Sequence, residues 1–488
     1  MPAKQRKSLI QKLQKDIDNA PNYDAWQNAA LSLDHIEGND EWKRIDKSSL
    51  YDYTLISRRL EQLRLSHRTN DIAQLIRALR EGLHHDLGNM GNYKLYNKSH
   101  IGTKKLIEDY VSQVCYSLDY LCDNDVPELP LDKKLGFFED TSLSFGRPSL
   151  LLSGGATLGL FHLGVVKALW EHDLLPQVIA GSSIGSIIAG IIGTRTDDEL
   201  GALLDRDDHD LQAWKYLGLK GLLLGRGLFD AKNLEQCIRL NIGEQTFQEA
   251  YEHSGRSTNI SVSPAAIRNQ KSRLLCGYTS PYVTIWSAAL ASCSIPGIFP
   301  PATLIQKNAN NSLSPYLPLH RWVDGSVKSD LPIERLTHLY DVNYHVVSQT
   351  NPHIVPFIPE GGHAPDPSWT NLPWRMLKSE LQYHGTGVFD FLRKKAPTEI
   401  LRQTAGHAYT VMAQRYYGDV TIAPRYTVSD FMKITKNPTP EMLQQFMLEG
   451  QRATWPQISM IKAHSQISQT LEQCIKRTKR RLKLKIFC

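Results

Sequence analysis

Hydrophobic positions follow three different patterns along the chain. Up to the glycine-containing stretch Gly88–Asn92, apolar residues recur at helical spacing with charged residues between them, as from Ile72 to Leu79. Between residues 150 and 347, short apolar runs alternate with helical patterns, as expected for buried parallel strands joined by helices. Helical spacing returns at 374–392 and 430–475. The pattern predicts an α/β fold: a mainly parallel sheet flanked by helices, with a helical N-terminal domain and a helical C-terminal extension.

Turn-forming residues suggest where these regions meet. The stretch 123–130 contains two prolines and several acidic residues, which is typical of a linker. We therefore expect a helical N-terminal domain at 1–125 and a domain built on the sheet at 147–350. A helical extension that completes the core is expected at 351–475, followed by a basic tail at 476–488.

One glycine pattern suggests covalent chemistry. Gly181, Ser183 and Gly185 fit the G-x-S-x-G form, in which small residues let a strand turn sharply into a helix and expose the serine. The apolar run 177–180 before it suits a buried strand, and 186–192 after it can form a buried helix. The same short pattern also occurs as a small-residue turn in a packed core, so it does not identify a nucleophile by itself.

An earlier loop strengthens that interpretation. Gly154, Gly155 and Ala156 follow the apolar strand candidate 149–152 and precede the helical pattern 161–170. Backbone N–H groups at such a helix start can bind an anion, including the oxyanion of a tetrahedral intermediate. The loop lacks the Gly-Lys-Ser/Thr of a Walker motif and the G-x-G-x-x-G of a dinucleotide site.

Together these blocks resemble the patatin-like lipid acyl hydrolases. The resemblance rests on Gly154–Gly159, Gly181–Gly185, the Ala-Ser and Pro-containing segment Ala291–Pro300, and the Asp324–Gly325 pair. Ser348–Phe357 resembles the segment that follows the aspartate in the triacylglycerol-lipase branch of the family.

The resemblance implies that residues 147–350 form a patatin-like catalytic domain with a patatin-type sheet. It implies a Ser183–Asp324 catalytic dyad without histidine. It also implies an oxyanion hole formed by Gly154, Gly155 and Ala156, and neither a cofactor nor a metal. Ser183 and Asp324 both follow apolar strand candidates, so we expect them at the carboxyl ends of parallel strands, where α/β sites form. Four further glycines support the motifs: Gly159, Gly181, Gly185 and Gly325.

The resemblance extends to the N-terminal region. Glu37–Trp42, Tyr51–Tyr53 and Leu83–Gly88 resemble the domain that precedes the patatin core in intracellular triacylglycerol lipases, so it covers most of residues 10–430. Leu158 is a departure, because many patatins carry Arg or Lys there. The triacylglycerol-lipase branch tolerates an uncharged residue at this position, so Leu158 points to that branch.

Two alternatives use histidine. If a histidine triad operated, the order Ser, Asp, His would make His345, His353 or His384 the partner. His35 and Asp40 have the spacing of an acyltransferase motif, but such spacings arise by chance and a structural pair in a helical region is the simpler interpretation.

Composition narrows the class of protein. The 488 residues include seven scattered cysteines without C-x-x-C spacing, which indicates neither a disulfide framework nor a zinc site and favours a reducing compartment. The basic start lacks the apolar core of a signal peptide. The apolar, glycine-containing segment 217–229 suits a mobile lid, and a buried helical hairpin equally well.

The charge of the chain is concentrated at its end. Residues 476–485 carry seven positive charges and no acidic residue, whereas the whole chain has a net charge of +6, so the remainder carries about −1. Three interpretations stay open: contact with an anionic membrane surface, a nucleic-acid patch without a recognised reader motif, or a solvated tail.

These observations lead to one main hypothesis. We expect a serine lipid acyl hydrolase, a triacylglycerol lipase or phospholipase, that cleaves long-chain acyl esters through an acyl-enzyme on Ser183. The alternatives are a non-catalytic lipid-binding scaffold and a lipid transacylase that uses the same serine. The expected partner is a lipid at a membrane or lipid-droplet surface, with possible anionic lipid contact by the basic tail, no nucleic acid, and a cytoplasmic, peripheral location.

Overall fold

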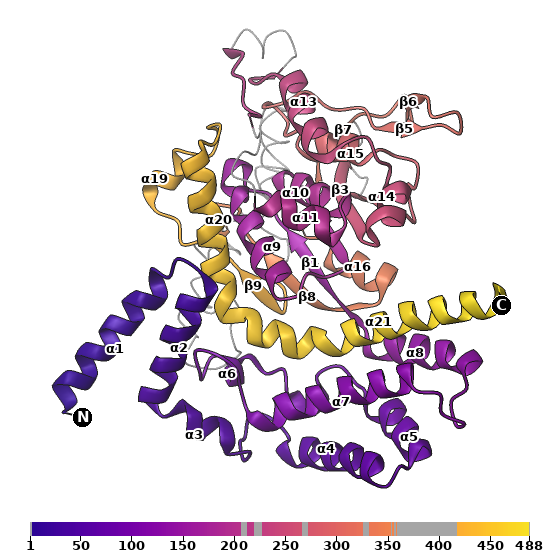
Figure 1. The fold of residues 1–488 in the computed structure, drawn as a ribbon. Coiled ribbons are helices and arrows are strands. Elements are labelled where there is room, and N and C mark those ends of the chain that lie inside the picture. Colours follow the sequence, from indigo (N-terminus) through magenta and orange to yellow (C-terminus); the bar gives the residue numbers. More distant parts are fainter. Residues whose placement is uncertain are drawn as a thin grey trace, which may run out of the picture.

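The computed structural model describes residues 2–205, 212–218, 227–265, 272–325, 331–352, 354–355, 358 and 417–487. Helices predominate in the N-terminal part, and a central sheet follows (Figure 1). The segment 219–226, the helical pattern 374–392, His353 and His384 lie outside the described residues.

The N-terminal region is entirely helical where it forms regular structure. Side-chain caps start several of these helices; Asp52 accepts a hydrogen bond from the Leu55 amide, and Asp71 from the Gln74 amide. The sequence pattern placed the last clear helix before Gly88–Asn92, but the structure adds three beyond it, namely α6, α7 and α8. The helices of this region are α1 (Ala3–Asp18), α2 (Tyr23–Glu37), α3 (Asn39–Arg44), α4 (Tyr53–Arg68), α5 (Ile72–Gly82), α6 (Tyr93–Tyr96), α7 (Lys105–Asp123) and α8 (Leu131–Phe145).

The central sheet has the strand order β4-β3-β2-β1-β8-β9, and β7 also pairs with β3. The pairs β1–β2, β1–β8, β2–β3 and β8–β9 are parallel, whereas β4 and β7 run antiparallel to β3. The predicted mainly parallel sheet is therefore confirmed. The strands are β1 (Arg147–Leu152), β2 (Val178–Gly181), β3 (Ser257–Pro264), β4 (Arg273–Leu275), β7 (Trp322–Asp324), β8 (Val342–Ser348) and β9 (Val420–Ile422), and β5 (Ile305–Lys307) with β6 (Leu313–Pro315) forms a separate hairpin.

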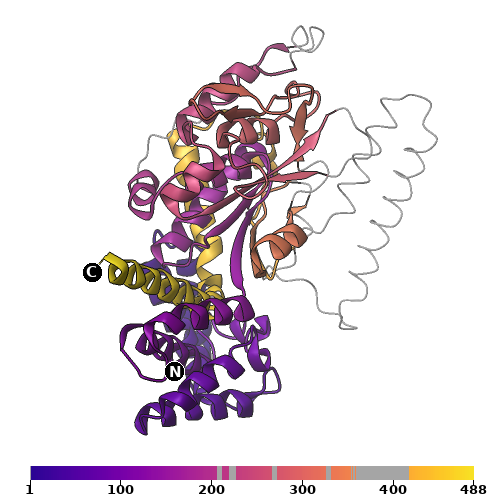
Figure 2. The same cartoon turned by 90° about the vertical axis from the view of Figure 1, so that its right-hand side faces the viewer.

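Helices connect and flank these strands (Figures 1 and 2). They are α9 (Phe161–Glu171), α10 (Ile184–Gly193), α11 (Asp197–Leu204), α13 (Ala231–Ile242), α14 (Phe247–Ser254), α15 (Ile285–Ser292), α16 (Ile333–Tyr340), α19 (Val428–Phe431), α20 (Pro440–Thr454) and α21 (Ile458–Phe487).

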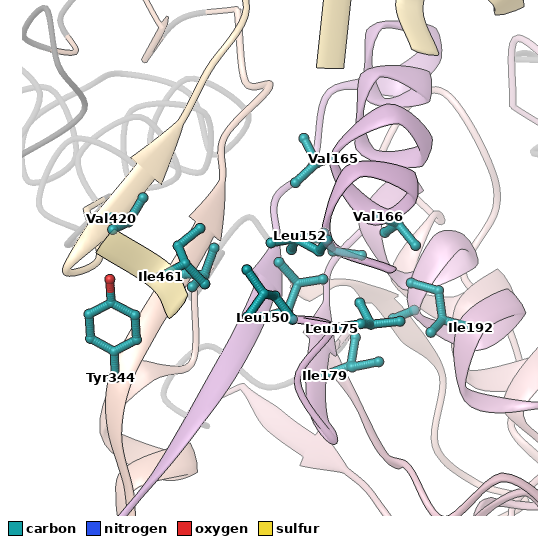
Figure 3. Packing of buried hydrophobic residues seen from close by; sticks show 14 of the residues in the cluster. Leu150, Leu152, Val165, Val166, Leu175, Ile179, Ile192, Tyr344, Val420 and Ile461 are labelled. Atoms are coloured by element: carbon teal, nitrogen blue, oxygen red, sulfur yellow. The ribbon is translucent and has the colours of Figure 1, made fainter. Parts of the chain in front are cut away.

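Both faces of the sheet are buried, which explains the continuous apolar run in β1. Leu150 and Leu152 belong to one hydrophobic cluster, whereas Leu151, which points the other way, belongs to a second cluster with Leu336 of α16. Figure 3 shows side chains of the first cluster, contributed by β1, β2, β8, β9, α9, α10 and α21. Its labelled members are Leu150, Leu152, Val165, Val166, Leu175, Ile179, Ile192, Tyr344, Val420 and Ile461.

Helix α21 joins the two parts of the molecule. It runs between the N-terminal helices and the sheet and contacts α7, α8 and β1 (Figure 1). The basic segment continues this helix: Arg477 forms ion pairs with Asp119 and Asp123, and Arg481 forms one with Asp125. The segment is thus helical through residue 487 and ion-paired to the N-terminal region as far as Arg481, which differs from an unstructured solvated tail.

Candidate active site

Ser183 lies at a sharp turn between β2 and α10. Strand β2 ends at Gly181, and α10 begins at Ile184. Ser183 has φ 51° and ψ −128°, a positive-φ conformation that a non-glycine residue adopts only when its surroundings hold it there. The strand, turn and helix expected for the G-x-S-x-G pattern are present, and Ser183 is 6% exposed.

The two glycines of this turn allow a close approach of backbone segments. A Cβ atom on Gly181 would lie 2.1 Å from the carbonyl oxygen of Gly185, and one on Gly185 would lie 2.2 Å from the carbonyl oxygen of Leu152. Larger residues would therefore push the turn away from β1. The spacing of glycines around Ser183 is a packing requirement of this turn.

The glycine loop after β1 packs directly against the turn. Gly154 and Gly155 lead into a short 3-10 helix at Ala156–Leu160, which continues into α9. A Cβ atom on Gly159 would lie 2.1 Å from Cγ2 of Ile184, the residue after Ser183. The structure thus brings together the two glycine patterns that the sequence analysis singled out.

A buried hydrogen-bond network supports this loop. His162, fully buried in α9, donates from Nε2 to the Ser153 carbonyl oxygen at 3.0 Å, and its Nδ1 lies 2.6 Å from Ser348 Oγ. Thr350 Oγ1 donates to the Gly154 carbonyl oxygen at 2.9 Å. Burial lowers the pKa of His162 to about 4, so the ring is neutral at pH 7. The sequence analysis did not single out His162, although a lone histidine in an apolar helix was a usable signal.

Asp324 is fully buried at the end of β7. We expected it at the end of a parallel strand, but β7 runs antiparallel to β3. Gly181 is in register with Ile260 of β3, and Asp324 is in register with Val262, two residues further along the same strand. The ends of β2 and β7 therefore meet at neighbouring positions on β3, about 7 Å apart along the strand.

One short segment contacts both candidate catalytic residues. The Ser183 amide donates to Ser292 Oγ at 3.0 Å, and the Asp324 amide donates to the Ser294 carbonyl oxygen at 3.1 Å. Cys293 lies between Ser292 and Ser294 in the sequence. Burial raises the pKa of its thiol, and the charge of Asp324 raises this pKa further. A hydrogen bond between the thiol and Ser183 acts in the opposite direction. The structure thus brings Ser183 and Asp324 together around Cys293. Gly325, which follows Asp324, lies close to strand β3. A Cβ atom on Gly325 would be 2.3 Å from the carbonyl oxygen of Ser261.

The structure also places His345, His35 with Asp40, and Leu158, which the sequence analysis had discussed. The ring nitrogens of His345 face Ser149 Oγ at 3.0 Å and Thr337 Oγ1 at 3.4 Å. His35 Nδ1 and Asp40 Oδ2 lie 2.9 Å apart on exposed side chains of the N-terminal helical region. Leu158 is fully buried in the glycine loop.

One group of side chains has the spacing of metal ligands in the described part of the chain: Asp34, Glu37 and His100. Lys43 Nζ donates to Asp34 Oδ2 at 2.8 Å, and the His100 amide donates to Asp34 Oδ1 at the same distance. The ammonium group already neutralises the buried carboxylate, so the donor set fits an internal ion pair. Among the described residues, none of the helices combines the length and apolar composition needed to cross a bilayer.

Comparison with known proteins gives matches over nearly the whole chain. A patatin-like phospholipase family model matches residues 150–337, and a model described as a domain of unknown function (DUF3336) matches 3–143. Triacylglycerol lipase ptl3 of Schizosaccharomyces pombe is 36% identical over 472 residues, which cover 92% of this chain and 94% of the relative.

Two further relatives are longer than the region they share with this chain. Triacylglycerol lipase SDP1L of Arabidopsis thaliana is 35% identical over 93% of this chain, and triacylglycerol lipase 4 of Saccharomyces cerevisiae is 35% identical over 98% of it. The chain spans 57% of the length of the plant protein and 54% of that of the yeast protein.

Proposed function

The chain belongs to the patatin-like phospholipase family, and we propose that it is a serine lipid acyl hydrolase that cleaves long-chain acyl esters. The resemblance noted in the sequence, the patatin-type fold included, is thereby confirmed. The observation that carries the proposal is the strained turn at Ser183, which lies against the glycine loop and shares residues 292–294 with Asp324.

In the proposed reaction, Asp324 removes the proton from Ser183 Oγ as this oxygen attacks the ester carbonyl. Asp324 then gives this proton to the departing alkoxide, so that the ester C–O bond breaks and the alcohol leaves. In the second half, Asp324 takes a proton from water as the water oxygen attacks the acyl-enzyme, and returns it to Ser183 Oγ as the fatty acid is released. A carboxylate is a weak base toward an alcohol, with an ordinary pKa of about 3.9, so the geometry of the pair must contribute much of the effect. Burial of Asp324 excludes water that would otherwise screen its charge.

The negative charge of the tetrahedral intermediate falls to the glycine loop. We assign the backbone N–H groups of Gly154, Gly155 and Ala156 as its donors, since the loop packs beside the Ser183 turn. The Ser183 amide itself donates to Ser292 Oγ. The neutral His162 network beneath the loop would hold these donors in place without adding a charge.

We propose a neutral acylglycerol as the preferred substrate. The three relatives described above are named triacylglycerol lipases, and Leu158 places a buried apolar side chain where a cation could have met a phosphate headgroup. A panel of purified lipids tests this directly. Faster cleavage of a phospholipid than of a triacylglycerol in matched emulsions would contradict the assignment.

We propose that the enzyme works at a membrane or lipid-droplet surface, aided by α21. Lys476, Arg480 and Lys483 are exposed and follow i, i+4, i+7 spacing, so they share one face of the helix. Each basic residue near anionic lipid contributes about 1 kcal/mol before screening. Changing these three residues to Gln should weaken binding to anionic liposomes at low salt.

The matched control for that experiment removes the same charge from α1. Its basic residues Lys4, Lys7 and Lys12 are also exposed. If their triple Gln variant weakens liposome binding as much as the α21 variant does, net charge alone explains the attraction and the α21 surface is not a specific contact.

The central experiment is covalent labelling with a fluorophosphonate probe, combined with ester hydrolysis. Ser183→Ala should abolish both signals, and Asp324→Asn should reduce both to near background. His345→Ala serves as the histidine control and should keep activity. Loss of activity in folded His345→Ala, or turnover by Ser183→Ala, would overturn the dyad.

A further inference from the structure

The hydroxyl of Ser292 is bonded on both sides. It accepts the hydrogen bond from the Ser183 amide at 3.0 Å and donates to the Ser261 carbonyl oxygen at 2.8 Å. Ser292 is completely buried at the end of α15, so water cannot replace either bond. The hydroxyl therefore bridges the Ser183 turn and strand β3.

The position of this bridge matters because of the register of β3. Ser261 lies between Ile260, which is in register with Gly181, and Val262, which is in register with Asp324. The bridge thus fastens the Ser183 turn to the point of β3 that separates the strand ends carrying the two dyad residues. Ser294, two residues after Ser292, holds the Asp324 amide through its carbonyl oxygen.

The Ser183 backbone needs such support. Its φ of 51° is a strained conformation for a non-glycine residue and persists only where the surroundings enforce it. A hydrogen bond from the amide of Ser183 itself acts directly on that torsion. Loss of the bond would let the turn relax and shift the serine hydroxyl relative to Asp324.

We propose that Ser292 is a positioning residue that keeps Ser183 Oγ aligned with the Asp324 carboxylate for proton transfer. This inference rests on the proposed function, because it needs Ser183 as the nucleophile and Asp324 as the base. Ser292 acts through the backbone of Ser183 and has no contact with the reacting atoms in this scheme. Its loss should lower the rate of acylation and leave substrate binding unchanged.

Three substitutions separate this role from packing. Ser292→Ala removes the hydroxyl, Ser292→Cys keeps a similar volume with a weak donor, and Ser292→Thr keeps the hydroxyl. The matched control is Ser465→Ala in α21, which removes an equally buried serine hydroxyl away from the candidate site; Ser465 Oγ donates to the Ile461 carbonyl oxygen one helical turn earlier. Each variant is purified as the full chain and compared by melting temperature, fluorophosphonate labelling rate, and kcat and KM for a soluble short-chain ester.

We expect kcat and the labelling rate to fall about tenfold or more in Ser292→Ala and Ser292→Cys, at unchanged KM, since small misplacements of a reacting group cost rate. Ser292→Thr should restore most of the rate, and Ser465→Ala should match the wild type. Because Ser292→Cys preserves the packed volume, it tests the inference even if Ser292→Ala fails to fold.

Two outcomes would overturn the inference. One is folded Ser292→Cys that labels and turns over as fast as Ser465→Ala. The other is a loss of rate in Ser292→Thr as large as in Ser292→Cys, which would assign the effect to packing. Ser183→Ala in the same experiment tests the proposed function separately. Turnover by that variant would show that Ser183 is not the nucleophile, whatever the result for the Ser292 variants.

Discussion

Acidification should destabilise the protein through His162. Its pKa is about 4 in the folded chain, because the ring is fully buried, against an ordinary value of 6.5 when exposed. Well above pH 6.5 the ring is neutral in both the folded and the unfolded state, so its burial does not lower the free energy of unfolding. As the pH falls from 6.5 toward 4, the unfolded chain takes up the proton first, so the stability of the folded state decreases.

The size of this effect follows from the difference between the two pKa values. A difference of 2.5 between 6.5 and about 4 corresponds to about 3.4 kcal/mol once both states are protonated. At pH 5 the loss should be about 2 kcal/mol, since the unfolded ring is then almost fully protonated and the folded ring is not. His162 is completely buried, so solvent screening does not reduce this figure.

The assay is urea unfolding, followed by tryptophan fluorescence, of the wild type and His162→Gln at pH 7, 6 and 5. The variant loses the hydrogen bonds to Ser153 and Ser348, so it should be less stable at pH 7. The difference in free energy of unfolding between the wild type and the variant should be about 2 kcal/mol smaller at pH 5 than at pH 7, because the variant carries no titrating ring at this position.

Burial lowers the pKa of His67 as well, so this residue adds to the acid sensitivity of both proteins and the comparison between them isolates His162. Burial also lowers the pKa of His85. His338→Gln, which changes an exposed residue of α16, controls for loss of a histidine as such. A gap between the wild type and His162→Gln that stays constant from pH 7 to pH 5 would refute the reasoning.

Three further predictions concern stability and are all checked by thermal or urea unfolding. Gly164→Ala should destabilise by several kcal/mol, since its Cβ would lie 1.8 Å from a carbonyl oxygen of α20, whereas Gly136→Ala in α8 meets open space and should stabilise by about 0.5–1 kcal/mol. Lys134→Met should cost about 2–3 kcal/mol, because the buried ammonium group donates to the carbonyl oxygens that end α7. Arg477→Gln should cost less than about 1 kcal/mol and lose that difference in high salt, because its ion pair with Asp119 is partly exposed; a larger cost that survives high salt would contradict this.

The two local elements of the candidate site, the Ser183 turn and the glycine loop, could be predicted from the sequence alone. The turn at Ser183 and the glycine loop depend on contiguous residues, because small side chains at fixed spacing decide where a backbone can turn or approach another strand. The alternation of apolar runs likewise predicted a mainly parallel sheet. In α7, apolar residues at helical spacing, such as Ile107, Val111, Val114 and Leu118, carried a usable signal that the sequence analysis overlooked.

Two features of the C-terminal half depended on the tertiary structure. The direction of β7 follows from its register with β3, which joins residues about sixty positions apart and has no signature in the three residues of the strand. The helical, ion-paired state of the basic segment needs the acidic residues of α7 and the following turn, more than 350 positions away, so charge counting could not predict it.

The supporting residues of the site show the same division. Ser292 stood in a segment that resembled the family but carried no assigned role, and His162 was one histidine among seventeen. Their roles follow from their hydrogen bonds. Ser292 accepts one from the amide of Ser183, and His162 donates one to the carbonyl oxygen of Ser153, next to the glycine loop. Local sequence determined that the sharp turn at Ser183 and the glycine loop would form, because both are short-range backbone geometries. Only the tertiary structure decided which distant side chains hold them in place, because hydrogen bonds across the sheet exist only once the strands have paired.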